Sequence, residues 1–140
     1  MLRRLLCVTL LLVCSVAQAE QSCPKTFSSF IARFESSAEF QRLHTRFPLS
    51  YSFLDGSAEP DPKEVKVMVS QASAAKYPGI IFPSKATQAS VPLKRKLLRH
   101  PSGTQVVHFD KPESDVYSVS FHFTQTVDCW LLVKVEDTSL

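Results

Sequence analysis

The chain has 140 residues, with sixteen basic and thirteen acidic side chains and a formal net charge of +3. So small an excess argues against binding to nucleic acid or to an anionic membrane, which normally shows as a strong basic excess. Three glycines and ten phenylalanines argue against a disordered chain and indicate an aromatic-rich core.

The first nineteen residues match a secretory signal peptide. Arg3 and Arg4 supply a positive start, residues 5–16 are almost wholly apolar, and Ala17-Gln18-Ala19 places small side chains where a signal peptidase needs them. The apolar run is shorter than the roughly 20 residues that a membrane-spanning helix needs. We therefore expect cleavage after Ala19, with no stable membrane insertion afterwards.

Cleavage leaves residues 20–140, a length that suits one domain. Fourteen basic and thirteen acidic residues remain there, so the net charge falls to +1. Acylation of Cys14 is the alternative, but Val13 stands where a lipoprotein signal needs a small residue. The leader thus predicts an exported protein, periplasmic or secreted.

Two cysteines follow the leader, Cys23 at the start of the domain and Cys129 near its end. In an oxidising compartment such a pair predicts one disulfide. A redox-active or metal-binding pair is disfavoured, because the two lack C-x-x-C spacing and a nearby histidine ligand. Closing a loop of about a hundred residues stabilises a fold by roughly 4–5 kcal/mol in the chain-entropy model.

Two helices are predicted at the start of the domain. Pro24 suits a first helical position. An apolar stripe at helical spacing follows it: Phe27, Phe30, Ile31 and Phe34. Ser36 and Glu39 match a capping box, so a second short helix is expected there, ending at Pro48. Its inward residues are expected to be Phe40, Leu43 and Phe47.

From Pro48 onward the hydrophobic period changes to that of strands. Strands are predicted over 49–54, 65–69, 91–99, 104–109, 116–124 and 129–136. Residues 71–90 are ambiguous, and residues 80–82 are expected to pack as a loop or an edge strand. The chain is therefore an α+β domain, in which an N-terminal helix pair packs on one face of a curved antiparallel sheet.

Both ends of this domain resemble a known family. The N-terminal motif is Phe27-x-x-Phe30-x-x-x-Phe34, then Phe40-Gln41 and Arg46-Phe47-Pro48-Leu49, and the C-terminal motif runs from Cys129-Trp130 to Leu140. Together they resemble a family of secreted bacterial domains of unknown function, of the nuclear-transport-factor-2-like, cystatin-like cone type. The resemblance implies a helix pair cradled by a bent antiparallel sheet. It implies no activity, because it supplies no catalytic residues to carry over.

Cone-shaped folds of this kind often hold a pocket, and some relatives in the wider group are isomerases or dehydratases. Such chemistry needs an acid or base whose pKa is tuned towards neutrality. The candidates are His44, His108, His122, Asp110 and Asp128. If the face opposite the aromatic one lined a pocket, His122 and Tyr51 would form a polar pair. The alternative is that His122 simply lies on a solvated face.

Other kinds of site are not supported. The chain has no short-spaced pair of histidines and no His-x-x-Glu pair, so no metal site is predicted. It has no Gly-x-Ser-x-Gly elbow and too few glycines for a phosphate-binding loop, so no nucleophilic triad or cofactor is predicted.

The run 94–100 is the strongest local concentration of charge. Lys94 and Lys96 are expected on one face of a strand, and Arg95 and Arg99 on the other. Cations on both faces predict an edge strand, where they discourage edge-to-edge aggregation. The functional alternative is a docking stripe for an acidic partner protein or an anionic envelope component.

The last strand suggests a homodimer. Simple alternation places Trp130 and Leu132 on the same face as Lys134 and Glu136. That face would be half apolar and would need cover, which a second copy could provide through pairing of sheet faces.

These observations favour an exported, non-catalytic binding protein of the bacterial envelope. It would bind a protein or small ligand through the concave side of the sheet or through the basic run. An inhibitor or immunity-type protein is one specific form of this hypothesis. The alternative is a small pocket enzyme of isomerase or hydratase type.

Overall fold

The computed structural model describes residues 22–112 and 116–140. The expected signal peptide, its cleavage site at Ala19 and Cys14 lie outside the described residues. The helices are α1 (Phe27–Phe34), α2 (Ala38–Leu43) and α3 (Lys85–Ser90), with short 3₁₀ helices η1 (Gln71–Lys76) and η2 (Pro78–Ile80). The strands are β1 (Thr45–Asp55), β2 (Lys63–Val69), β3 (Lys94–Arg99), β4 (Gln105–Asp110), β5 (Ser118–Gln125) and β6 (Trp130–Asp137).

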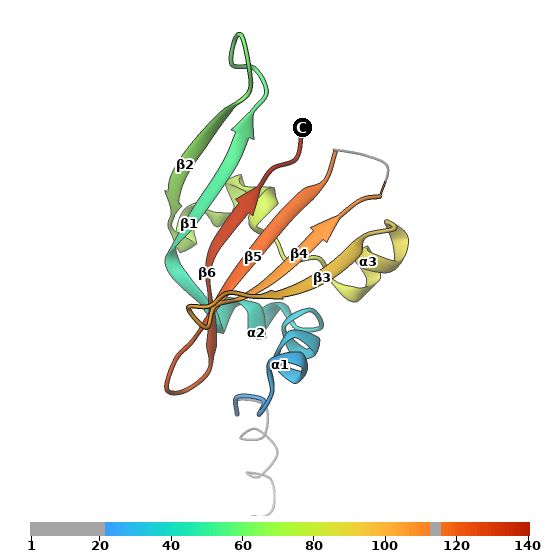
Figure 1. Ribbon diagram of the computed structural model, residues 1–140. Coiled ribbons are helices and arrows are strands. Elements are labelled where there is room, and N and C mark those ends of the chain that lie inside the picture. The colour runs from blue at the N-terminus through green and yellow to red at the C-terminus, as the bar shows by residue number, and fades with distance from the viewer. Residues whose placement is uncertain (1–21, 113–115) are drawn as a thin grey trace, which may run out of the picture.

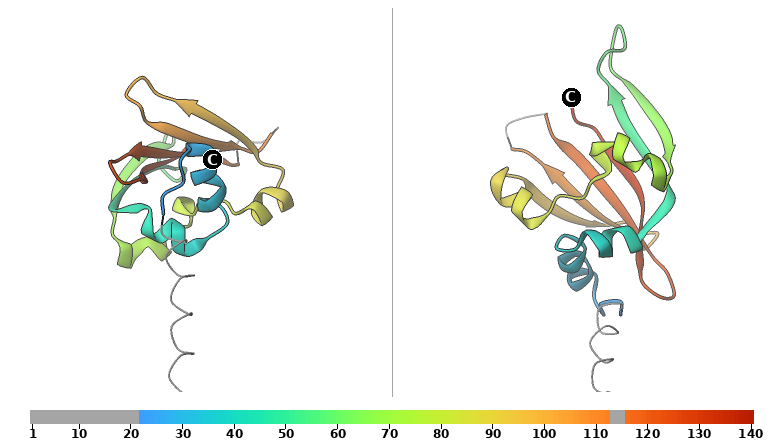
Figure 2. Two further views of the ribbon diagram at one scale, coloured as in Figure 1. Left: turned by 90° about the horizontal axis from the view of Figure 1, so that it is seen from below. Right: turned by 180° about the vertical axis from the view of Figure 1, so that it is seen from behind.

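The six strands form one mixed sheet in the order β2-β1-β6-β5-β4-β3 (Figure 1). Neighbouring strands are antiparallel except β1 and β6, which run parallel. The two further views show the helices gathered on one side of this sheet (Figure 2). The predicted α+β class, with a helix pair against one face of a sheet, is confirmed, and the parallel β1–β6 pair is a feature that the sequence did not indicate.

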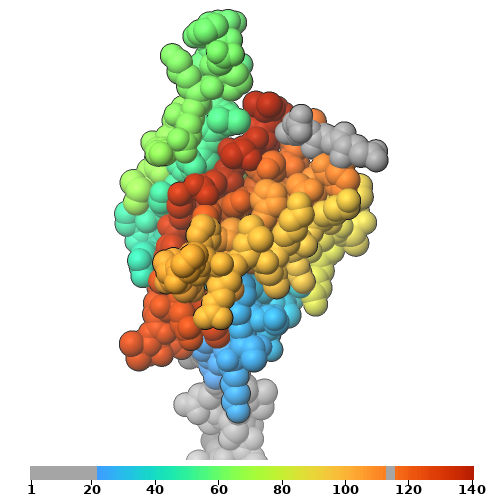
Figure 3. Space-filling view, viewed as in Figure 1, coloured from blue at the N-terminus to red at the C-terminus, as the bar shows by residue number. Residues whose placement is uncertain are grey.

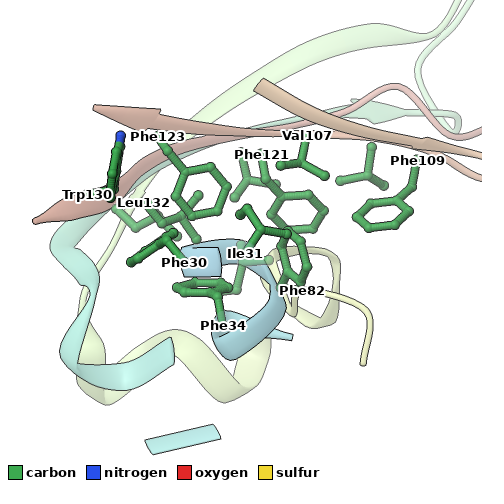
Figure 4. Close-up of a cluster of buried hydrophobic side chains, with 14 of the residues drawn as sticks. Phe30, Ile31, Phe34, Phe82, Val107, Phe109, Phe121, Phe123, Trp130 and Leu132 are labelled. Carbon is green, nitrogen blue, oxygen red and sulfur yellow. The ribbon is translucent and has the colours of Figure 1, made fainter. Parts of the chain in front are cut away.

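The core lies between α1 and the sheet. The predicted stripe of α1 is confirmed, because Phe30, Ile31 and Phe34 are all buried. They face aromatic side chains of β5, and the ring centroids of Phe34 and Phe123 lie 5.2 Å apart (Figure 4). Phe82, from the segment between η2 and α3, completes the cluster at 4.8 Å from Phe121. Edge-to-face contacts of this kind add to the stability gained by apolar burial.

The second helix differs from the expectation at both ends. Ser37, not Ser36, is its N-cap, and the Ser37 hydroxyl accepts the backbone N–H of Phe40. The helix stops at Leu43, whose side chain is 49% exposed. The chain turns into β1 because the carbonyl of His44 accepts the N–H of Leu132, which starts the pairing of β1 with β6. Phe47 therefore belongs to a strand.

The ambiguous segment 71–90 contains no strand. Ser70 and Ser84 cap η1 and α3, their hydroxyls accepting the backbone N–H groups of Ser73 and Thr87. Such caps favour helical turns at these points.

The face expected for Trp130 and Leu132 was wrong. Both are buried against the helix side, where the ring of Trp130 lies 5.6 Å from that of Phe30. His122 pairs with Lys134 but Phe123 pairs with Leu132, so Val133 is an extra residue on β6. Such a bulge reverses the alternation. Lys134 therefore reaches the opposite face, and the apolar patch that suggested a homodimer does not exist.

The Cys23–Cys129 disulfide is present, with the two Cα atoms 5.4 Å apart. It joins the segment before α1 to the start of β6, which holds the helix over the sheet. Such a bond is consistent with an oxidising, extracellular environment. Among the described residues, no helix is long and apolar enough to cross a membrane.

Candidate functional site

Strand β3 is an edge of the sheet, as its charge pattern predicted. All six of its residues, Lys94 to Arg99, are exposed. The space-filling view shows this gold segment uncovered on the face turned to the viewer (Figure 3). Four of the six carry a positive charge and none carries a negative one. The structure thus presents a basic strand at the surface.

The four cations of β3 divide into two paired and two unpaired groups. Arg95 contacts Glu35 at 3.0 Å, and Lys96 contacts Asp110 of β4 at 3.3 Å. Within residues 22–112 and 116–140, no carboxylate lies within ion-pair distance of Lys94 or Arg99. These two charges, at the two ends of the strand, are available to a partner.

Glu35 anchors β3 to the helices. It caps the C-terminus of α1, and its side chain is 5% exposed. Besides Arg95, its carboxylate accepts a hydrogen bond from the side-chain amide of Gln88 at 3.1 Å and lies 3.8 Å from Lys85. A carboxylate is disfavoured near a helix C-terminus and in the interior, so this one depends on its cationic partners. Glu35 carries no local sequence signal for this role, because its partners come from distant segments of the chain.

The proposed pair of Tyr51 and His122 does not form, because the two lie on opposite faces of the sheet. Tyr51 is aligned with Val135 on the helix side, whereas His122 is aligned with Lys134 on the other side. The Tyr51 hydroxyl instead donates to Asp137, 3.3 Å away. Burial and the Asp137 carboxylate raise the pKa of Tyr51 to about 12. Tyr51 is thus a protonated donor in a packed core.

The open face of the sheet, on the side away from the helices, holds a polar network. His122 Nε2 lies 2.6 Å from a carboxylate oxygen of Glu136, which also contacts Lys134. The His122 side chain is 15% exposed, and burial lowers its pKa despite the opposing effect of Glu136. Burial also acts to raise the pKa of Glu136, but Lys134 and His122 together outweigh it and lower that pKa. The network is consistent with a neutral His122 bonded to an ionised Glu136.

Acidification is expected to destabilise the protein through His122. Because the folded pKa of His122 is lowered, the unfolded chain takes up the proton first as the pH falls through about 6.5. The free energy of unfolding should therefore decrease as the pH falls below that value, and less steeply for His122→Gln. Urea unfolding at a series of pH values measures both slopes.

His44 supplies the control for this experiment. It packs on Phe40, and burial lowers its pKa too. His44→Gln should remove its own share of the pH dependence, and the two shares should add in the double variant because the rings lie on opposite sides of the sheet. Equal slopes for wild type and His122→Gln would contradict the prediction.

Two of the candidate residues do come together, in a cluster that the sequence analysis did not foresee. His108 Nδ1 lies 2.9 Å from the Ser120 hydroxyl, because the two residues are paired across β4 and β5. Asp110 lies 3.7 Å from His108 Nε2, beyond hydrogen-bond distance. Asp110 therefore does not orient the ring as the acid of a catalytic triad would. The cluster extends the polar network towards Lys96.

Two solved structures are similar to this chain. A nuclear-transport-factor-2-like protein from Bacteroides fragilis matches with a TM-score of 0.57 and 16% sequence identity, over 81% of this chain and 47% of that protein. A cystatin-like protein from Bacteroides caccae matches with a TM-score of 0.46 and 18% identity, over 82% and 79% of the two chains. The chain thus spans about half the length of the first. No family model and no curated protein matches it.

The fold is of the nuclear-transport-factor-2-like type. In this nuclear-transport-factor-2-like fold, aromatic side chains fill the space between α1 and the sheet. Phe30, Phe34 and Phe123 are fully buried there and contact one another (Figure 4). Among the described residues, no group of three or more His, Cys, Asp or Glu side chains is placed to hold a metal ion. The basic edge is exposed, and the open face of the sheet carries the polar network of His122 and Glu136.

Proposed function

We propose that this protein is an exported binding protein of the bacterial envelope, which docks an acidic protein partner on strand β3. The observation that carries the proposal is the exposed basic edge, with Lys94 and Arg99 lacking a carboxylate partner in the part of the chain that the structure describes. Unpaired cations on a rigid surface attract a complementary partner and fix how it docks. Capping of a toxin or a hydrolase is one specific form of this function.

The packing of the interior supports a binding protein over a pocket enzyme. An isomerase or hydratase needs an acid or base facing an enclosed substrate. Here Tyr51 and His122, the pair expected to line a pocket together, lie on opposite faces, and the helix side is filled by phenylalanines. Partner binding uses the outside of the fold, which this packing leaves available.

Charge reversal at the ends of β3 tests the proposal. The oxidised domain, residues 20–140, is used to capture partners from envelope extract, and native mass spectrometry identifies what is bound. A stoichiometric protein partner is expected with the wild type. The double variant Lys94→Glu, Arg99→Glu should lose at least about tenfold in affinity, because two attractive contacts become repulsive.

A second double variant controls for the change in net charge. Lys25 and Lys76 are also exposed and have no ion-pair partner among the described residues, but they belong to the segment before α1 and to η1. Lys25→Glu, Lys76→Glu should retain the partner. Equal capture by both double variants would reject docking on β3, and capture of a small molecule instead of a protein would favour the enzyme alternative.

A further inference from the structure

The outer edge of β3 has free backbone groups as well as charges. Residues 94–99 bond to β4 along one side, and within the described residues their backbone makes no hydrogen bond on the other side. An edge strand of this kind presents a row of N–H and C=O groups to which another strand can add. A partner that uses these groups must supply an extended backbone.

The side chains of β3 flank this free edge from both faces of the sheet. Lys94 and Lys96 are paired with Asp110 and His108, so they lie on the open face. Arg95 lies on the helix side, where it reaches Glu35. A flat anionic membrane would meet the cations of one face, whereas an added strand has alternating side chains that meet both. The distribution of charge therefore favours a peptide strand.

The two unpaired cations set the spacing that acidic residues of a bound strand must match. Lys94 and Arg99 are five positions apart, an odd number, so they lie on opposite faces of the strand. The rise of about 3.4 Å per residue places them roughly 17 Å apart. Between them, Leu97 and Leu98 are 49% and 50% exposed. Arg95 and Lys96 are already paired with carboxylates of this chain.

We propose that β3 binds an acidic segment of a partner by strand addition. From its N-terminus, this segment has the residue order acidic, apolar, apolar, polar, polar, acidic. The first acidic residue lies opposite Arg99 and the last opposite Lys94, since antiparallel pairing is the more stable arrangement. The apolar pair covers Leu98 and Leu97, and the uncharged polar pair faces Lys96 and Arg95. The inference rests on the proposed function. It adds a mode of recognition to the docking surface proposed there.

A second copy of this chain is the less suitable occupant of the same edge. In full-overlap antiparallel pairing of β3 with itself, Lys94 of each copy would lie opposite Arg99 of the other. Like charges directly opposite each other destabilise a strand pair. The positive charge that attracts an acidic strand therefore disfavours self-association through β3.

Synthetic peptides test the proposed residue order of the bound segment. The probe contains Glu-Val-Val-Thr-Thr-Glu, and the control Glu-Val-Val-Thr-Glu-Thr has the same composition but places both carboxylates on one face. NMR titration of the oxidised domain is expected to show amide shifts centred on β3. The probe should bind about tenfold more tightly than the control, and the Lys94→Glu, Arg99→Glu variant should lose this preference.

Backbone methylation separates strand addition from simple charge attraction. Successive N–H groups of a strand point to opposite edges, so methylating every second residue blocks one edge and leaves the other intact. Of the two alternately N-methylated probes, one should lose binding and the other should keep it. Equal binding of both would overturn strand addition, as would equal binding of probe and control.

The remaining outcomes are equally decisive. Absence of probe binding, self-association that depends on Lys94 and Arg99, or binding to anionic vesicles instead of the probe would each overturn the inference. If the envelope partner is still captured through Lys94 and Arg99 while the probe fails, docking on β3 stands and the strand mode falls. If charge reversal leaves partner capture unchanged, the proposed function itself fails.

Discussion

Replacing Cys23 and Cys129 together with serine is expected to lower the free energy of unfolding by about 4 kcal/mol. The disulfide spans 106 positions, nearly the whole described domain, so its removal restores much conformational freedom to the unfolded chain. The melting temperature should fall by about 15 °C, given the usual entropy of unfolding of a domain of this size. Urea unfolding and calorimetry of the two proteins measure the loss.

Reduction provides the matched control for the serine variant. A reductant should bring the wild type to the stability of Cys23→Ser, Cys129→Ser and should leave the variant unchanged. A loss below about 1 kcal/mol would show that the contacts of α1 with the sheet, and not the bond, hold the two ends together.

The elements predicted with the right position are those whose signal is local. The α1 stripe repeats at helical spacing, and β5 alternates strictly, with Phe121 and Phe123 on the buried face and His122 on the other. The edge position of β3 followed from cations at successive positions, which a central strand could not accommodate. In each case the information lies within a few neighbouring residues.

The errors arose where pairing between distant segments decides the structure. The bulge at Val133 depends on the register of β6 against β5, and it reversed the faces expected for Trp130 and Lys134. The start of β1 at Thr45 depends on parallel pairing with β6, about ninety residues later in the chain. Alternation within one strand contains no information about either.

The candidate site shows the same division. The four basic residues of β3 could be named from the sequence, but which of them are neutralised could not. Arg95 is neutralised by Glu35, which follows α1, and Lys96 is neutralised by Asp110, which belongs to β4. The cross-strand partners of His108 and His122 were equally hidden. The structure therefore reduces four equivalent cations to two with free charge.

Removal of Arg95 is expected to destabilise the fold more than removal of any other cation of β3. Arg95→Met leaves the buried carboxylate of Glu35 with Gln88 and the more distant Lys85. Breaking a buried pair in this way costs about 3 kcal/mol, the lower end of the usual range because Lys85 remains nearby. Lys96→Met, which breaks a partly exposed pair, should cost less than Arg95→Met by the same urea unfolding.

A double-mutant cycle separates the buried charge from the loss of packing. In Glu35→Met, Arg95→Met both charges are gone and apolar side chains of similar length replace them, so most of the stability should return. Glu35→Met alone should cost less than Arg95→Met, because the remaining arginine is partly exposed and can be hydrated. Additive losses in the double variant would contradict a coupled pair. Recovery would mean that Arg95 serves to neutralise the buried carboxylate of Glu35, which leaves Lys94 and Arg99 as the unpaired charges of β3.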